Sequence, residues 1–109
     1  GTIRKRIRAI VQEGLGPVRN ARKITKTIDQ LEEIDLALED LAVRNRQDLI
    51  MALEMKGMVD TAIAIGRSAL LREESRGVHF REDFPIRRDE WRKNIGTFLE
   101  NGKIEARVL

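Results

Sequence analysis

The regular spacing of apolar residues between positions 24 and 41 is the feature that most constrains the fold. Apolar residues recur there at intervals of three or four, and acidic residues fill many of the positions between them. Such spacing places the apolar side chains on one face of a helix and the charged ones on the other. Asn20 is a suitable N-cap, so the sequence predicts an amphipathic helix over residues 21–43. The apolar stripe consists of Ile24, Ile28, Leu31, Ile34, Leu38 and Leu41.

Two further segments carry the same helical periodicity. Isoleucines at helical spacing predict an amphipathic helix over residues 2–14, and the Gly-Leu-Gly-Pro run ends it because proline cannot continue a helix. A longer segment predicts a third helix over residues 46–75, with apolar side chains on two of its faces. Two apolar faces indicate contacts on two sides. Gly57 and Gly66 indicate that a neighbouring backbone approaches this helix closely.

Three helices joined by short connections predict an all-α fold, a three-helix antiparallel bundle with up-down-up topology. The helical pattern stops at Gly77 and Pro85 prevents its return, so residues 76–109 are expected to form an irregular extension. A short helical turn from Asp89 is expected to carry Trp91. An Asn-Gly pair between alternating residues near the end of the sequence predicts a short β-hairpin.

The composition excludes several kinds of site. The chain has no cysteine, so disulfides, thiolate metal sites and cysteine nucleophiles are ruled out. Its uncharged apolar runs are much shorter than the roughly 20 residues of a membrane-spanning helix, so no direct membrane insertion is expected. The 109 residues have the length of one helical domain. Because the first residue is glycine instead of methionine, this domain is expected to be a fragment of a larger protein.

The net charge of +3 hides an uneven distribution of charge along the chain. Residues 1–28 carry eight Lys or Arg against one acid, whereas residues 29–60 carry nine acids against three bases. Two helices with complementary faces explain this pattern. The alternative is a small basic nucleic-acid-binding module, although its basic segment lacks aromatic residues for stacking and any recognised motif. Its basic residues would be Arg4, Lys5, Arg6, Arg8, Arg19, Arg22, Lys23 and Lys26.

The residue types that carry chemistry are concentrated between positions 70 and 94. His79 is the only histidine of the chain, and Glu82 and Asp83 follow it closely, as in a metal site or a general-acid pair. Such trios are more often hydrogen-bonded structural elements. Ser75 as a nucleophile would need a base oriented by a third group, and no spacing provides one. No catalytic, cofactor-binding or metal-binding residue is therefore assigned.

The arginines of this segment point to a structural role. They alternate with carboxylates, and the planar guanidinium suits bidentate bonds that order an irregular backbone. The sequence therefore predicts an ion-paired clamp, and the same clamp is a candidate for docking onto another domain or subunit. Its basic members are Arg72, Arg76, Arg81, Arg87 and Arg88, and its acidic members are Glu73, Glu74, Glu82, Asp83 and Asp89.

A family resemblance is carried by three motifs. Residues 72–85, Arg-Glu-Glu-Ser-Arg-Gly-Val-His-Phe-Arg-Glu-Asp-Phe-Pro, closely resemble the C-terminal signature of the succinate dehydrogenase/fumarate reductase flavoprotein family, E-S-R-G-x-H followed by R-x-D-[FY]-P. Residues 90–94 resemble its W-x-K-H segment, with Asn94 where histidine is usual. The Gly-Pro-Val-Arg-Asn run at 16–20 resembles its G-x-V-R turn. L-aspartate oxidase and adenylylsulfate reductase share relatives of this domain, but the R-x-D-F-P and W-R-K segments favour the succinate/fumarate branch.

The resemblance implies a C-terminal helical domain that is not catalytic alone. In this family the domain packs beside a flavin-binding domain and a capping domain, which are the implied partners together with an iron–sulfur subunit. FAD and the oxidation of succinate or reduction of fumarate would belong to the larger protein, which would be cytoplasmic and membrane-associated only through partner subunits. The residues assigned to domain docking or to structure are Glu73, Ser75, Arg76, Gly77, His79, Arg81, Asp83 and Trp91.

Overall fold

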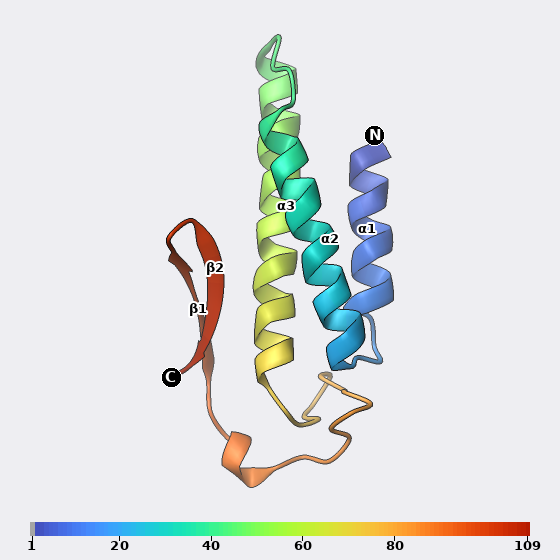
Figure 1. Ribbon diagram of the computed structural model, residues 1–109, viewed down its shortest axis with the longest axis vertical. Coiled ribbons are helices and arrows are strands. Elements are labelled where there is room, and N and C mark those ends of the chain that lie inside the picture. The colour runs from blue at the N-terminus through green and yellow to red at the C-terminus, as the bar shows by residue number, and fades with distance from the viewer. Residues whose placement is uncertain (1) are drawn as a thin grey trace.

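The computed structural model describes residues 2–109 and contains three antiparallel helices and a C-terminal β-hairpin (Figure 1). The molecule is elongated, 52 × 26 × 19 Å, and the hairpin lies alongside the third helix. The predicted up-down-up bundle with a short hairpin is confirmed. The elements are α1 (Thr2–Gly14), α2 (Ala21–Glu39), α3 (Arg46–Leu71), the 3-10 turn η1 (Asp89–Trp91), β1 (Ile95–Glu100) and β2 (Lys103–Val108).

Helix α2 begins where the sequence predicts and ends four residues earlier than residue 43. At its start, Oδ1 of Asn20 accepts a hydrogen bond of 2.8 Å from the Lys23 amide, which confirms the predicted N-cap. At its end, the amides of Asp40 and Leu41 bond to carbonyls three residues back instead of four. This tightening closes the helix, because the chain must turn to reach the next N-cap.

Helix α3 begins after the N-cap Asn45, whose Oδ1 accepts a bond of 2.9 Å from the Asp48 amide. It ends at Leu71, four residues before the predicted residue 75. The helix stops because Arg72 takes an extended conformation, with φ −79° and ψ 104°. The guanidinium of Arg81 then bonds to the last carbonyls of the helix in place of further backbone amides.

The core lies where the predicted apolar stripes of the three helices meet. Ile7 and Ile10 of α1 and the stripe of α2 pack against one face of α3. The other face of α3 contacts the hairpin, where Ile104 of β2 packs onto the core. Helix α3 therefore has contacts on two sides, as its two apolar faces predict. Leu49 and Leu53 near its start are exposed instead. Within residues 2–109, no helix has the length and apolar character that crossing a bilayer requires.

Two glycines mark the places where helices approach most closely. A Cβ on Gly14 would lie 1.5 Å from Oγ1 of Thr27, so α1 meets α2 at van der Waals distance only because the side chain is missing. A Cβ on Gly66 would lie 3.0 Å from Cγ1 of Ile28, so the close neighbour at that position is a side chain and not the predicted backbone. The same role predicted for Gly57 is wrong, because nothing lies within 4 Å of a Cβ built there.

The hairpin turns at the Asn-Gly pair that predicts it. Asn101 and Gly102 have φ values of 51° and 76°, the left-handed conformations that a two-residue hairpin loop requires. The register pairs Glu100 with Lys103 and Leu99 with Ile104. Because paired residues share a face, the face that carries Ile104 faces α3 and the opposite face points to solvent.

Candidate functional site

Residues 72–93, called the clamp below, run across the end of the bundle where α3 stops and α2 starts (Figure 1). The backbone of Arg19, in the α1–α2 connection, pairs with this segment: its amide bonds to the Phe80 carbonyl at 2.9 Å, and its carbonyl accepts from the Glu82 amide. Side chains of the clamp supply most of the remaining hydrogen bonds. The predicted ion-paired clamp is therefore present in part: Arg72 and Arg76 pair with Glu74, and Arg81 pairs with Asp83. Among the described residues, no ion pair is formed by the other predicted members Glu73, Arg87 and Asp89.

Arg81 joins two helix ends. Its side chain is almost fully buried, with 1% of the residue exposed, and Nη1 donates to the carbonyls of Leu70 at 2.9 Å and Arg72 at 3.2 Å. Its Nε and Nη2 bond to the two oxygens of Asp83 at 3.0 and 2.6 Å. Asp83 in turn accepts a bond of 2.9 Å from the Ala21 amide. The Arg81 cation thus lies at the C-terminus of α3, and the Asp83 anion lies at the N-terminus of α2. The helix dipole favours each charge at that end.

The environment of Asp83 keeps its carboxylate ionised. Partial burial works to raise the pKa of Asp83, but hydrogen bonds from Arg81 and the Ala21 amide outweigh it and hold the pKa below its ordinary value. The Phe84 ring lies 4.8 Å from the Arg81 guanidinium carbon and covers the cation. Both charges are therefore fixed in place.

Glu74 is the buried acid of the clamp, with no exposed surface. Its Oε2 accepts bonds from Arg76 Nε at 2.8 Å and Arg72 Nη1 at 2.7 Å, and its Oε1 accepts from the Arg88 amide at 2.9 Å. The bond from Arg76 is the largest cause that lowers the pKa of Glu74 to about 2, against the opposing effect of burial. Its negative charge is compensated on both oxygens, which a buried carboxylate requires.

Ser75 braces the backbone of the clamp. Its Oγ accepts a bond of 3.0 Å from the Arg81 amide and donates to the Phe84 carbonyl at 2.8 Å. Its own amide bonds to the Ile86 carbonyl at 3.3 Å. The hydroxyl is thus used in structural hydrogen bonds to the clamp backbone, beyond the end of α3 at Leu71, and no base within residues 2–109 bonds to it.

His79 contacts arginines, and the trio with Glu82 and Asp83 does not assemble. Its Nδ1 lies 3.1 Å from Arg19 Nη1, and its Nε2 lies 3.4 Å from the Arg72 carbonyl. Because a guanidinium only donates, these partners assign the neutral tautomer with the proton on Nε2. Glu82 bonds instead to Asn20, at 2.7 Å. In the described part of the chain, no three His, Cys, Asp or Glu residues are grouped to hold a metal.

The surroundings of His79 favour the neutral imidazole. Burial is the largest cause that lowers the pKa of His79, and the positive charges of Arg19, Arg81 and Arg72 lower it further. The hydrogen bond to the Arg72 carbonyl opposes these effects. An imidazole held neutral beside three cations is a hydrogen-bond acceptor for Arg19, not a proton donor for a reaction.

A tight turn projects from the clamp beside His79. The amide of Arg76 bonds to the His79 carbonyl at 2.8 Å, and the His79 amide bonds back to the Arg76 carbonyl at 3.0 Å. Gly77 adopts φ +58°, which favours glycine at this position. Val78 at the tip is 97% exposed. The turn thus presents an apolar side chain to the surroundings.

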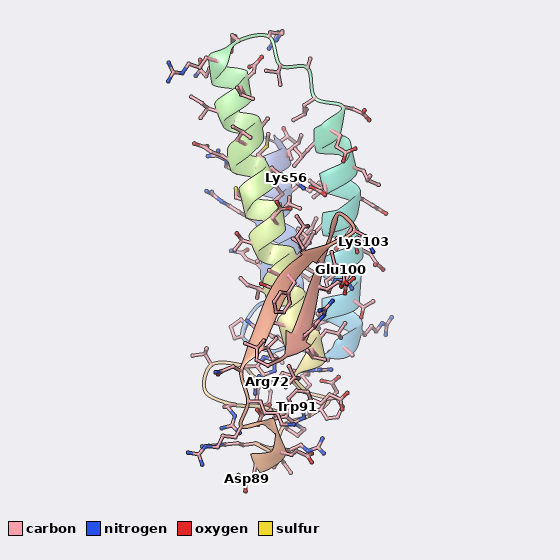
Figure 2. All side chains as sticks on the ribbon, turned by 90° about the vertical axis from the view of Figure 1, so that its left-hand side faces the viewer. Lys56, Arg72, Asp89, Trp91, Glu100 and Lys103 are labelled. Carbon is pink, nitrogen blue, oxygen red and sulfur yellow. The ribbon has the colours of Figure 1, made fainter. Side chains whose placement is uncertain are left out.

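Arg72 links the clamp to the root of the hairpin. Its Nη1 bonds to the Trp91 carbonyl at 2.6 Å and its Nη2 to the Lys93 carbonyl at 2.5 Å. The guanidinium carbon lies 5.8 Å from the centre of the Trp91 ring, and Figure 2 shows the two residues together below the hairpin. Trp91, on the predicted short turn η1, is therefore anchored through Arg72.

Among the predicted docking residues, the structure brings Ser75, Arg76, His79, Arg81 and Asp83 into one network and places Glu73 outside it, exposed to solvent. The buried acid is its neighbour Glu74. In the sequence, Glu74 stands two residues from both Arg72 and Arg76, the two arginines that it binds. Arg19 carries no comparable local signal, since its partner lies 60 residues away.

The basic residues of the opening segment are only partly neutralised. Arg4 pairs with Glu54 of α3 at 2.7 Å, and this is the contact that joins the basic and acidic segments, as charge complementarity predicts. The acids of α2 pair mainly with bases of α3: Asp35 with Lys56 at 2.6 Å and Glu32 with Arg67 at 3.3 Å. Complementary faces therefore account for part of the uneven charge.

Comparison with known proteins gives consistent results. The family described as fumarate reductase flavoprotein C-term matches residues 4–108. The chain is 37% identical, over 89 residues, to an FAD-dependent oxidoreductase of Methanocaldococcus jannaschii, covering 82% of this chain and 16% of that protein. It is 36% identical, over 111 residues, to one of the subunits of the fumarate reductase (CoM/CoB) of Methanothermobacter marburgensis, covering 98% of this chain and 20% of that protein. No match supports a nucleic-acid-binding module.

Solved structures share the fold. A mutant Escherichia coli quinol fumarate reductase superposes with a TM-score of 0.90 at 27% identity, over 98% of this chain and 20% of that one. The Mycobacterium smegmatis Sdh1 complex in its apo form superposes with a TM-score of 0.77 at 19% identity, over 99% of this chain and 19% of that one. The chain thus spans about a fifth or less of the length of the proteins it matches.

Proposed function

Because the chain belongs to the fumarate reductase flavoprotein C-terminal family, we propose that it is the structural and docking domain of an FAD-dependent flavoprotein subunit of the succinate dehydrogenase or fumarate reductase type. Residues 1–109 would form one domain of a longer polypeptide. FAD and the dicarboxylate chemistry would belong to other domains. The role of this domain is mechanical: it braces the flavin-binding and capping domains and offers surface to an iron–sulfur subunit, through which any membrane association would arise.

The observation that carries this proposal is the exposure of large apolar side chains. At the clamp end, Val78 is 97% exposed, Ile86 is 73% exposed, and Phe80 and Val18 are also exposed. The inner face of the hairpin adds Leu99, which is 76% exposed. Small proteins that function alone rarely leave so much apolar surface uncovered, and such surface is typical of a protein interface.

The clamp gives the docking surface its rigidity. Arg81 and Glu74 are buried within the domain, so their part in docking is indirect. They fix the backbone that carries the exposed Val78 and Ile86. The predicted docking residues therefore divide into an internal brace, which includes Ser75, and a presenting surface. An ordered surface loses less conformational entropy when a partner binds.

A chimaera tests the proposal directly. In the M. marburgensis protein, which is 36% identical over 98% of this chain, the corresponding region is replaced by residues 1–109. We expect the chimaera to retain FAD and fumarate reduction, and the same protein truncated before this region to lose both. A double variant with Val78→Asp and Ile86→Asp should lower FAD retention, because both changes place charge in the proposed interface.

The matched control is Val43→Asp with Leu36→Asp at the opposite end of the bundle, where both residues are also exposed. It should retain more FAD than the double variant at the clamp end. Equal activity of the chimaera and the truncated protein would contradict the proposal. A yellow colour or succinate oxidation by the 109-residue chain alone would contradict it as well.

A further inference from the structure

A pocket of about 580 Å³ lies between the α1–α2 connection, the last turns of α3 and the root of the hairpin. Its polar wall consists of Arg19, Ser68, Arg72, His79, Asn94 and Thr97. Its other wall is apolar and includes Ile65 and Ile95. Figure 2 shows Arg72 beneath the hairpin, at the lower edge of this region. The pocket shares Arg72 with the ion pairs of the clamp and Ala69 with the core, whereas its remaining lining residues belong to neither.

The positive charge of Arg19 is not balanced at this pocket. Two guanidinium groups line it with the neutral imidazole of His79, and no carboxylate among residues 2–109 lines it, although Arg72 pairs with Glu74 behind the wall. Arg19 is half-buried, and its hydrogen bonds go to the carbonyls of Gly16 at 3.2 Å and Leu15 at 3.3 Å and to His79. All of these acceptors are uncharged. Burial lowers the pKa of Arg19 with no acid to offset it.

Arg19 differs in this respect from the three arginines that hold the carboxylates of the clamp. Arg72 and Arg76 share Glu74, and Arg81 holds Asp83. No ion pair to Arg19 is formed within the described residues. A half-buried cation without a counter-charge is costly, and a carboxylate that binds beside it removes that cost.

Donor groups remain for such a ligand. A guanidinium has five N–H donors. Arg19 uses three of them on Gly16, Leu15 and His79. Arg72 likewise uses three, on Glu74 and on the carbonyls of Trp91 and Lys93. Two donors of each guanidinium are therefore left over, and a guanidinium binds a carboxylate in bidentate fashion.

We propose that this pocket binds one carboxylate group, held by Arg19 with Arg72 as the second cation. The carboxylate comes from an Asp or Glu side chain of the protein surface that covers this end of the domain, and this choice of source rests on the proposed docking function. The apolar wall of Ile65 and Ile95 supports it, because residues beside the acidic one would pack there. A free carboxylate shares the chemistry but gains nothing from that wall.

Acetate titration of the 109-residue chain tests the site without any partner. The only histidine lines the pocket, so its imidazole NMR signals report on binding directly. At constant ionic strength, acetate should shift these signals in a saturable manner and raise the pKa of His79, since a nearby anion favours the imidazolium. Chloride at the same ionic strength should not. Absence of a saturable shift would overturn the proposal.

Three variants locate the site. Arg19→Gln should weaken acetate binding by about fivefold or more, as expected when a charge-assisted pair is lost. Arg22→Gln removes the same charge from an exposed position of α2 and should leave binding unchanged.

Thr97→Glu keeps Arg19 and adds a carboxylate at the pocket wall. It should abolish acetate binding and raise the pKa of His79, whereas Thr97→Gln should do neither. Equal weakening by Arg19→Gln and Arg22→Gln would overturn the assignment.

A peptide comparison tests the source of the carboxylate. The probes are a blocked Leu-Asp-Leu peptide and its Leu-Asn-Leu counterpart. If a side chain is the ligand, the Asp peptide should bind several-fold more tightly than acetate, and the Asn peptide should not compete with acetate. Equal affinity of acetate and the Asp peptide would overturn the side-chain source. Acetate binding is measured on the isolated chain, so its outcome is separate from that of the chimaera.

Discussion

Arg81 donates hydrogen bonds to both oxygens of Asp83, and each member of this pair also contacts the end of a different helix. The pair therefore does more than neutralise two charges. It replaces the backbone bonds that α3 loses at its C-terminus and meets an amide of α2 that has no helical partner. This explains why a fully charged arginine is almost completely buried in a small protein.

Replacing Arg81 by methionine is expected to destabilise the fold by about 3 kcal/mol or more, because Asp83 and the carbonyls of α3 lose their partner in a buried setting. Asp83→Asn should lower the free energy of unfolding by less than Arg81→Met, since the Asp83 carboxylate is partly exposed. Thermal unfolding followed by circular dichroism measures both changes. Arg22→Gln at an exposed site is the control for loss of positive charge. If Arg81→Met destabilises the protein no more than Arg22→Gln does, the role assigned to the pair is contradicted.

Stability should fall in acid because of Glu74. Its pKa is lowered from its ordinary 4.5 to about 2 in the folded protein, so between these values the unfolded chain binds a proton that the folded chain does not. The stabilising contribution is complete above pH 4.5 and is lost as the pH falls toward 2. Melting temperatures between pH 7 and pH 2 measure the effect.

The variant Glu74→Gln isolates this contribution. It should be less stable than the unaltered protein at pH 7 and should lose less stability as the pH falls, although Asp83 still contributes in the same direction. Parallel pH profiles for the two proteins would show that Glu74 is not the group responsible.

His79 should titrate below its ordinary value of about 6.5. Burial and three neighbouring arginines disfavour the imidazolium in the folded state. The unfolded chain therefore takes up the proton first, and stability declines as the pH falls from about 6.5 through the folded pKa. NMR titration of the single histidine gives this pKa without ambiguity. A pKa at or above 6.5 in the absence of added carboxylates would contradict the contact with Arg19.

Glycine to alanine changes should have opposite effects at two positions. Gly57→Ala is expected to stabilise the protein by about 0.5–1 kcal/mol, because nothing lies within 4 Å of the added methyl and alanine favours the helix. Gly14→Ala is expected to destabilise it by about 1–3 kcal/mol, because the methyl would overlap Thr27. Chemical denaturation compares the two variants. A stable Gly14→Ala protein would mean that α1 can move away from α2 at little cost.

Periodicity predicts much of this fold because the stripes of α1 and α2 depend on residues close together in sequence. The ends of α2 and α3 are predicted less well. Helix α3 stops at Leu71 because Arg81, ten residues later, bonds to its carbonyls, and local propensity contains no trace of that competition. The exposed start of α3 is a second case, since the apolar residues Leu49 and Leu53 have the spacing of core residues in the sequence.

The sequence predicts which residue types make up the site, but it does not predict which residues contact one another. A clamp of arginines and carboxylates follows from the sequence of residues 72–89, but the sequence does not say that Glu74 and not Glu73 is the buried acid. The contact between Arg19 and His79 joins segments far apart in the chain. Only the folded arrangement of the helices brings them together, so the sequence marks the motifs that contain them but does not predict the pocket that they line.

The pairing of Arg19 with the strand-like segment from Phe80 to Glu82 also bears on the order of folding. This pairing closes a loop of roughly 60 residues, and closing it costs conformational entropy. The cost is offset only after the helices have brought the two ends of the loop together. We therefore expect the helices to form their local contacts first and the clamp to become ordered late. Changes in the clamp should therefore accelerate unfolding far more than they slow refolding, so the lifetime of the native state depends on this small region.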